Sequence, residues 1–202
     1  MKARKTGSRH MLLLYKRVMD RLWKSTLFLG LLTLGIWGWG WFSPMVLIEA
    51  QNSVWLLAGS TTLLGFTLFA FFGRNMAYIQ AHPNHLRLVT PFLRTNISYK
   101  RIRSVHPSNF HQLYPPEEAS WAEKRLLEPF YGKTTVLIEL HDFPIPPFFL
   151  RLFLAPQMFS KGEKGLVLLV PDWMAFSTEI DSFRARQPVT RRQQGRVPGW
   201  LR

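Results

Sequence analysis

The chain has 202 residues, of which 26 are Lys or Arg and 12 are Asp or Glu, so its formal net charge at pH 7 is +14. It has no cysteine, which excludes disulfides and thiolate metal sites and is compatible with a reducing compartment. The length allows one domain with an anchor or one irregular domain, and the charge predicts an anionic partner, either lipid head groups or nucleic acid.

Residues 1–24 form a basic segment that we expect to lie in the cytoplasm. Cations placed directly before an apolar run are typical of the cytoplasmic flank of a membrane span. Four of them are candidate contacts for anionic lipid at the membrane surface: Lys16, Arg17, Arg21 and Lys24.

Two uncharged apolar runs follow, at 25–48 and 53–73. Roughly 20 apolar residues at 1.5 Å per residue span a hydrocarbon core of about 30 Å, so each run is long enough for a transmembrane helix. The connection at 49–52 is so short that the two helices must be antiparallel neighbours, and residues 25–73 are therefore predicted to be a transmembrane helical hairpin. A buried helix pair in a soluble core and a cleaved signal peptide both fit these long, charge-free runs less well.

The charges beside the hairpin predict its orientation. The connection carries only Glu49, whereas Arg74 and further cations follow the second run. The positive-inside tendency then places both termini in the cytoplasm, as in an integral inner-membrane protein with two transmembrane helices, and adds Arg74 to the candidate lipid contacts. Glycines of the first run could let the helices approach closely, namely Gly30, Gly35, Gly38 and Gly40.

Residues 74–186 read as a cytoplasmic domain of antiparallel strands and one closing helix. Strand patterns occur at 75–81, 86–90, 97–105, 134–141 and 165–170. Alternation predicts one buried face made of Leu86, Leu88, Ile97, Tyr99 and Ile102. After Pro171 the apolar spacing becomes helical, with Asp172 placed to cap the start and with Trp173, Phe176, Ile180 and Phe183 on one side. These elements predict a partly open barrel whose end is plugged by the helix.

The stretch 85–105, HLRLVTPFLRTNISYKRIRSV, with the late strands and the closing helix, resembles the bacterial pleckstrin-homology-like (PH-like) domains over about residues 76–186. Members of that family often follow one or two transmembrane helices. The resemblance implies an α+β membrane protein: a transmembrane hairpin followed by a PH-like antiparallel β-barrel closed by a C-terminal helix. Two segments depart from the pattern: 107–133, with a short helix expected at about 117–127, and the proline-rich 143–157. The turn at 82–85 lacks the basic residues with which eukaryotic relatives bind inositol phosphates, so that ligand is not expected.

The sequence predicts no catalytic, cofactor or metal site. The tripeptide 132–134, Gly-Lys-Thr, lacks the earlier glycine that a phosphate-binding loop requires. The histidine pairs at 82 and 85 and at 106 and 111 lack carboxylate companions at ligand spacing.

Two segments have a functional alternative beside a structural one. The segment 145–159 carries one charge, and either fills the core or lies in the cytoplasmic interface through Phe148, Phe149, Arg151 and Phe153. The tail 187–202 is expected to be disordered and basic. Its cations and those just before it either keep the chain soluble or contact anionic lipid: Arg184, Arg186, Arg191 and Arg192.

The expected function is that of a non-enzymatic, membrane-anchored PH-like module that binds a protein partner or anionic lipid head groups at the cytoplasmic face. Its expected partners are the bilayer and either another protein or a second copy of the chain. One alternative is an accessory subunit of a larger membrane complex. Nucleic-acid binding through the basic termini is less favoured, because membrane topology already accounts for those cations and no aromatic-basic stacking motif accompanies them.

Overall fold

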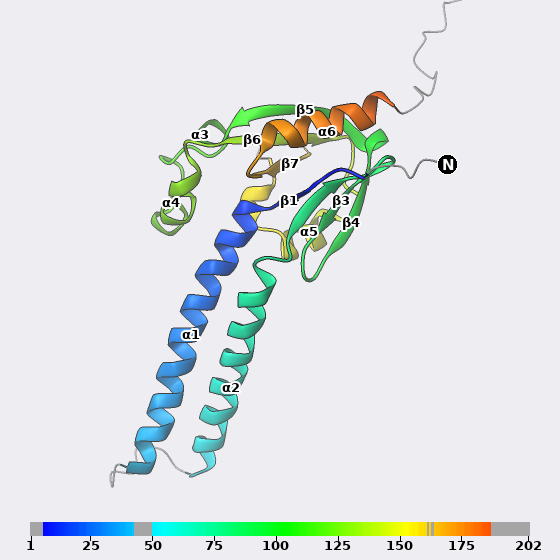
Figure 1. The fold of residues 1–202 in the computed structure, drawn as a ribbon. Helices are drawn as coiled ribbons and strands as arrows, with labels where there is room; N and C mark the ends of the chain where they lie inside the picture. The colour runs from blue at the N-terminus through cyan, green and yellow to red at the C-terminus, as the bar shows by residue number, and fades with distance from the viewer. Residues whose placement is uncertain (1–5, 43–49, 161, 163, 187–202) are drawn as a thin grey trace, which may run out of the picture.

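The computed structural model describes residues 6–42, 50–160, 162 and 164–186. It consists of a pair of long helices that project from a mixed α+β head (Figure 1). The pair is α1, Leu13–Phe42, and α2, Ala50–Gly73. Helix α2 begins at Ala50, within the connection predicted at 49–52, and residues 43–49 lie outside the described part of the chain.

The two helices are antiparallel neighbours, as predicted. The side chains of Thr26 and Thr67 are joined by a hydrogen bond of 2.8 Å, and closer to the head the rings of Trp23 and Phe71 meet edge to face at 5.6 Å. Farther from the head, a Cβ on Gly30 would lie 3.2 Å from the side chain of Leu64. Gly30 therefore provides the close approach expected of a glycine. No atom lies within 4 Å of a Cβ placed on Gly35 or Gly38.

The first antiparallel sheet has the order β1-β2-β3-β4. Its strands are β1 (Arg9–Met11), β2 (Tyr78–Ala81), β3 (His85–Val89) and β4 (Arg94–Ser98). The second has the order β5-β6-β7, with β5 (Ile102–Asn109), β6 (Thr134–Leu140) and β7 (Gly165–Leu168). Helix α6, Trp173–Ala185, crosses the head on the side away from α1 and α2 (Figure 1).

The predicted α+β class and antiparallel strands are confirmed, but the prediction of one partly open barrel is wrong, because the strands form two separate sheets. The strand predicted at 97–105 breaks at the 3-10 helix η1, Tyr99–Arg101. Tyr99 is buried there, and its hydroxyl donates a hydrogen bond of 2.8 Å to the carbonyl of His82. The 3-10 helix η1 therefore separates β4, the last strand of the first sheet, from β5, the first strand of the second sheet.

The remaining elements are short and connect β5 to β6 and β6 to β7. They are α3 (Phe110–Leu113), α4 (Trp121–Leu127), η2 (Glu128–Phe130), α5 (Pro147–Phe153) and η3 (Pro156–Met158). Helix α4 confirms the short helix expected at about 117–127, although it starts later, at the N-cap Ser120.

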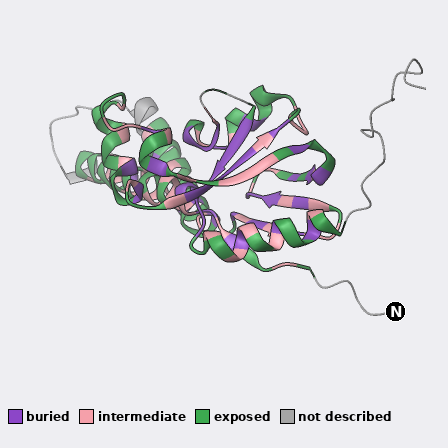
Figure 2. Ribbon diagram, turned by 90° about the horizontal axis from the view of Figure 1, so that it is seen from above, coloured by how far each residue is buried: buried purple, intermediate pink, exposed green. Residues whose placement is uncertain are grey.

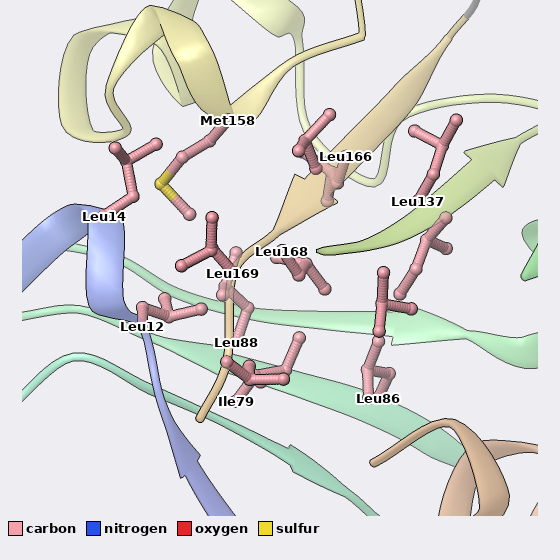
Figure 3. Close-up of a cluster of buried hydrophobic side chains, with 14 of the residues drawn as sticks. Leu12, Leu14, Ile79, Leu86, Leu88, Leu137, Met158, Leu166, Leu168 and Leu169 are labelled. Carbon is pink, nitrogen blue, oxygen red and sulfur yellow. The ribbon is translucent and has the colours of Figure 1, made fainter. Parts of the chain in front are cut away.

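The core lies between the two sheets and under α6, and it confirms the predicted face. Figure 3 shows Leu86 and Leu88 of the first sheet turned toward Leu166 and Leu168 of the second. Ile97, Tyr99 and Ile102 are buried as well.

Helix α6 covers this core with the side predicted for it. Phe176, Ile180 and Phe183 are buried and Trp173 is half-buried. Asp172 caps the helix by accepting a hydrogen bond of 2.9 Å from the backbone N–H of Ala175.

The boundary predicted at residue 24 does not separate the basic segment from the head. Strand β1 pairs antiparallel with β2, and Leu12 and Leu14 are each 1% exposed in the core. The backbone N–H of Leu13 donates a hydrogen bond of 2.9 Å to the carbonyl of Leu169, so the start of α1 is attached to the chain just after β7. The head is therefore completed by residues that precede the long helices.

Among the described helices, one segment, Val54–Gly73 of α2, is long and apolar enough to cross a membrane. Only 17% of its most apolar stretch is buried, unlike the core helix of a soluble protein. The prediction of two spans is not supported by this measure, which finds no second such segment among the described residues. The end of the run predicted at 25–48 also lies outside the described residues.

Candidate membrane-facing surface

The long helices expose large apolar side chains over most of their length. Figure 2 shows burial concentrated in the strands, while the helix pair is mainly exposed. The side chains of Phe28 and Trp39 on α1 are 70% and 71% exposed, and those of Trp55 and Phe72 on α2 are 72% and 66% exposed. Contiguous apolar surface of this extent marks contact with a membrane or with another protein.

Helix α5 continues this apolar surface onto the head. Its Leu150 is buried in the core, whereas Phe148, Phe149 and Leu152 are exposed. Pro147 stands in the first turn of α5, where its fixed φ favours a helix and its missing N–H costs nothing. The segment 145–159 thus combines both alternatives considered for it: one side fills the core, and the other presents apolar side chains to the exterior.

A row of three aromatic rings connects α5 to α2. The ring of Phe69 on α2 lies 4.9 Å from that of Phe92, which lies 5.8 Å from that of Phe153 on α5. Phe92 stands in the turn between β3 and β4 and is exposed. The contact places α5 and this turn on the side of the head from which α2 emerges.

Helix α4 flanks α1 on the same side of the head (Figure 1). A capping box starts it: the Ser120 hydroxyl accepts a hydrogen bond from the backbone N–H of Glu123, and the Glu123 carboxylate accepts one from the backbone N–H of Ser120. The guanidinium of Arg21 on α1 donates a hydrogen bond of 2.9 Å to the carbonyl of Ala122. Trp121 is 73% exposed beside it, as an indole at a membrane interface would be.

A pocket of about 370 Å³ opens between α1 and α4 and is strongly cationic. Its lining includes three cations of α1 and one of α4, namely Arg17, Arg21, Lys24 and Arg125. On a helix, positions that differ by three, four or seven residues share one side, so the three cations of α1 all face α4. The one carboxylate in the lining is that of Asp20, which is paired with Arg74 at 3.0 Å.

A second pocket, of about 540 Å³, lies between the loop that precedes α4 and the segment that follows α5. Its lining is mixed and includes Tyr114, Glu123, Arg151 and Gln157. The amide of Gln157 donates a hydrogen bond of 3.2 Å to the Glu123 carboxylate, and the Tyr114 hydroxyl donates one to the carbonyl of Phe159. Burial raises the pKa of Tyr114 to about 12, so its hydroxyl keeps its proton and acts as a structural donor.

The structure places most of the residues predicted to contact lipid in two separate groups, one at the α1–α4 pocket and one on α5. Arg17, Arg21 and Lys24 converge on the α1–α4 pocket, and Arg74 lies next to it through Asp20. Lys16 lies on the same segment of α1, one residue before Arg17. The predicted residues of 145–159 all belong to α5: Phe148, Phe149, Arg151 and Phe153.

The predicted cations near the C-terminus lie elsewhere. Arg184 and Arg186 stand at the end of α6, on the side of the head away from the long helices (Figure 1). Arg184 donates hydrogen bonds to the carbonyls of Ile102 and Arg103. These two cations are therefore not part of the surface around α4 and α5, and Arg191 and Arg192 lie outside the described residues.

Sequence reasoning missed Trp121, Arg125 and Phe92. The pair Trp121 and Arg125, four residues apart in a short capped helix, was the available local signal, and the Arg125 guanidinium does lie 5.7 Å from the Trp121 ring. No local pattern, however, indicates that α4 lies beside α1. That neighbourhood depends on contacts between residues about one hundred positions apart.

Within the described residues, no three His, Asp or Glu side chains gather as a metal site would require. The rings of His82 and His85 do come together, stacked at 4.9 Å, without a carboxylate completing a ligand set. Comparison with protein families, with characterised proteins and with solved structures finds no match to this chain.

Proposed function

We propose that the protein is a non-enzymatic, membrane-anchored PH-like module that binds anionic lipid head groups at the cytoplasmic face. The observation that carries this proposal is the continuity of exposed apolar side chains from α2 through Phe92 to α5, with cations gathered at the same end of the head. A bilayer has this layered chemistry, with an apolar interior beneath a surface of phosphates.

In this proposal α1 and α2 both cross the bilayer. The exposure of Phe28, Leu31 and Trp39 on α1 supports a second span, because an aqueous surface would make this exposure costly. The hydrogen bond between Thr26 and Thr67 satisfies two hydroxyls within the pair, as polar groups in lipid require.

The head and both termini would lie on the cytoplasmic side. The cations of α1 that precede the uncharged run, together with Arg74 after α2, support this orientation through the positive-inside tendency. Helix α5 would then lie in the interface with Phe148, Phe149 and Leu152 directed to the acyl chains, and Trp121 of α4 would sit at head-group level.

The PH-like assignment rests on the order of the elements. A four-stranded and a three-stranded antiparallel sheet enclose one core, and a C-terminal amphipathic helix covers it. The arrangement agrees with the resemblance seen in the stretch 85–105, with β1 supplied from before the long helices.

The depth of α5 tests the proposal. The chain has no cysteine, so Phe148→Cys gives a single labelling site for an environment-sensitive fluorophore in the full-length protein. In bilayers containing lipids brominated on the upper acyl chain, we expect strong quenching at position 148 and none in the control Lys100→Cys, an exposed residue of η1. Equal quenching at both positions, or none at either, would contradict an interfacial α5.

The orientation has a separate readout in intact cells. A membrane-impermeant maleimide should label Lys100→Cys only after the membrane is permeabilised. Labelling of this variant in intact cells would place the head outside and overturn the proposed topology.

A further inference from the structure

We propose that the pocket between α1 and α4 is a specific site for the phosphate of a lipid whose head group carries more than one negative charge. The inference rests on the proposed function, because it takes the bilayer surface to lie at the head-proximal end of α1. It goes further by naming one pocket, one ligand chemistry and Arg125 as a binding residue.

The charge of the pocket is the first argument. Arg17, Arg21, Lys24 and Arg125 enter one space of about 370 Å³, and Asp20 is the single carboxylate in its lining. Like charges held in one pocket repel each other unless a counter-ion occupies it. Asp20 is already engaged by Arg74 at 3.0 Å, so the four cations have little compensation from the lining.

The number of cations selects among anionic lipids. A phosphodiester head group with one negative charge would leave the pocket strongly positive, whereas a phosphomonoester or a lipid with two phosphates matches it better. Guanidinium groups bind phosphate oxygens in a bidentate way, and three of the four cations are arginines. The pocket has the volume of a small-ligand site, enough for a phosphate and its glycerol.

The position of the pocket favours a lipid over a soluble anion. Lys24 is the last charged residue before the uncharged run that starts at Ser25, and both line the pocket. A phosphate held there would be at the level of the lipid phosphates, with its acyl chains able to follow the exposed side of α1, where Phe28 is 70% exposed.

Arg21 links binding to the placement of α4. Its guanidinium donates a hydrogen bond to the carbonyl of Ala122, one residue after Trp121. A phosphate bridging Arg21 and Arg125 would therefore tie α4 to α1 and fix the exposed indole of Trp121 at the interface.

The test is titration of full-length protein in neutral detergent with single lipids, followed by native mass spectrometry. We expect one equivalent of phosphatidic acid to bind more tightly than phosphatidylglycerol, and phosphatidylcholine to bind weakest. Taking roughly fivefold in affinity for each basic side chain that contacts the lipid phosphate, we expect Arg21→Gln with Arg125→Gln to weaken phosphatidic acid binding by about 25-fold.

A second pair of substitutions guards against a folding artefact. Arg17→Gln with Lys24→Gln removes two charges from the same pocket without breaking the hydrogen bond from Arg21 to Ala122, and should weaken binding comparably. The matched control, Lys100→Gln with Arg186→Gln, removes two exposed charges that do not line the pocket, one in η1 and one at the C-terminal end of α6, and should leave affinity unchanged.

Several outcomes would overturn the inference. The inference is wrong if both pocket variants bind phosphatidic acid with the affinity of the wild type. It is also wrong if the control variant loses as much affinity as the pocket variants. Inorganic phosphate or glycerol phosphate that competes at concentrations matched to the lipid would show a soluble-anion site instead. Because the titration is done in detergent, its result is independent of the depth of α5, so failure of this inference and failure of the proposed function can be told apart.

Discussion

Asp20 of α1 and Arg74, the residue after α2, form an ion pair of 3.0 Å that closes the two long helices where they enter the head. Each side chain is about one-quarter exposed, at 27% and 26%. The Arg74 guanidinium also lies 4.3 Å from the centre of the Phe71 ring. The pair thus combines a charge contact with a cation–π contact at the point where the helix pair joins the head.

A double-mutant cycle should give a small but measurable coupling between the two residues. With Asp20→Asn, Arg74→Gln and the double variant, we expect a coupling of about 0.5–1 kcal/mol in detergent at low salt, declining as salt is added. The control is the pair formed by Lys164 and Asp142, whose side chains are 61% and 74% exposed and should show no coupling. Equal coupling energies in the two pairs would show that partial burial does not strengthen the pair of Asp20 and Arg74.

Gly30 should matter more to the packing of the helix pair than Gly35. A Cβ at this position would lie 3.2 Å from Leu64, so Gly30→Val must push the helices apart, at a cost of about 1–3 kcal/mol for overpacking. Gly35→Val introduces the same side chain where no atom lies within 4 Å and should cost much less. Thermal unfolding of both variants in detergent compares them, and similar losses at positions 30 and 35 would contradict the packing.

The parts of the fold that follow a regular pattern were predictable from the sequence. Leu86 and Leu88 stand on either side of Arg87 and are buried, and Phe176 and Ile180 recur at helical spacing and are buried. Burial of one side of a strand or helix imposes these periods directly on the sequence. The N-cap at Asp172 was predictable for another reason, because an aspartate just before a helical pattern is a preferred acceptor for the first free backbone N–H groups.

The parts that depend on distant neighbours were not predictable. Strand β1 has three residues, too few to show alternation, and its partner β2 begins at Tyr78, after both long helices. The prolines of 143–157 read as strand breakers, whereas Pro147 starts α5 from its first turn. The cationic pocket needs Arg125 from α4 beside Lys24 from α1, a neighbourhood that neither segment encodes locally.

Acidification should weaken the head through His82. Burial, then His85, then Arg87 lower the pKa of His82 below its ordinary 6.5. As the pH falls below about 6.5, His82 becomes protonated in the unfolded chain while it is still neutral in the folded chain. Protonation therefore favours the unfolded chain, and the folded head loses stability until the pH reaches the lower pKa of His82 in the folded state. The melting temperature should drop between about pH 7.5 and about pH 5.5, and less so in His82→Gln.

His85 provides the control for this pH effect. In His85→Gln the neighbouring ring no longer opposes protonation of His82, so the pKa of His82 should move back toward 6.5 and the acid-induced drop should shrink in part. If wild type and His82→Gln lost the same stability on acidification, other groups would account for the whole effect.

The last prediction concerns the contribution of the N-terminal segment to the head. Leu12 is 1% exposed and Leu88 is fully buried, and both belong to the one core, although Leu12 precedes the long helices. Replacing a buried Leu by Ala costs about 2–5 kcal/mol, a large fraction of a typical domain stability of roughly 5–15 kcal/mol. Leu12→Ala and Leu88→Ala should therefore destabilise the full-length protein in detergent to a similar extent, while Arg101→Ala, at an exposed position, should change little.

The melting temperature of the head, followed by near-UV circular dichroism, measures the stability of all three variants. A Leu12→Ala variant as stable as wild type would contradict the contribution of this side chain to the core of the head.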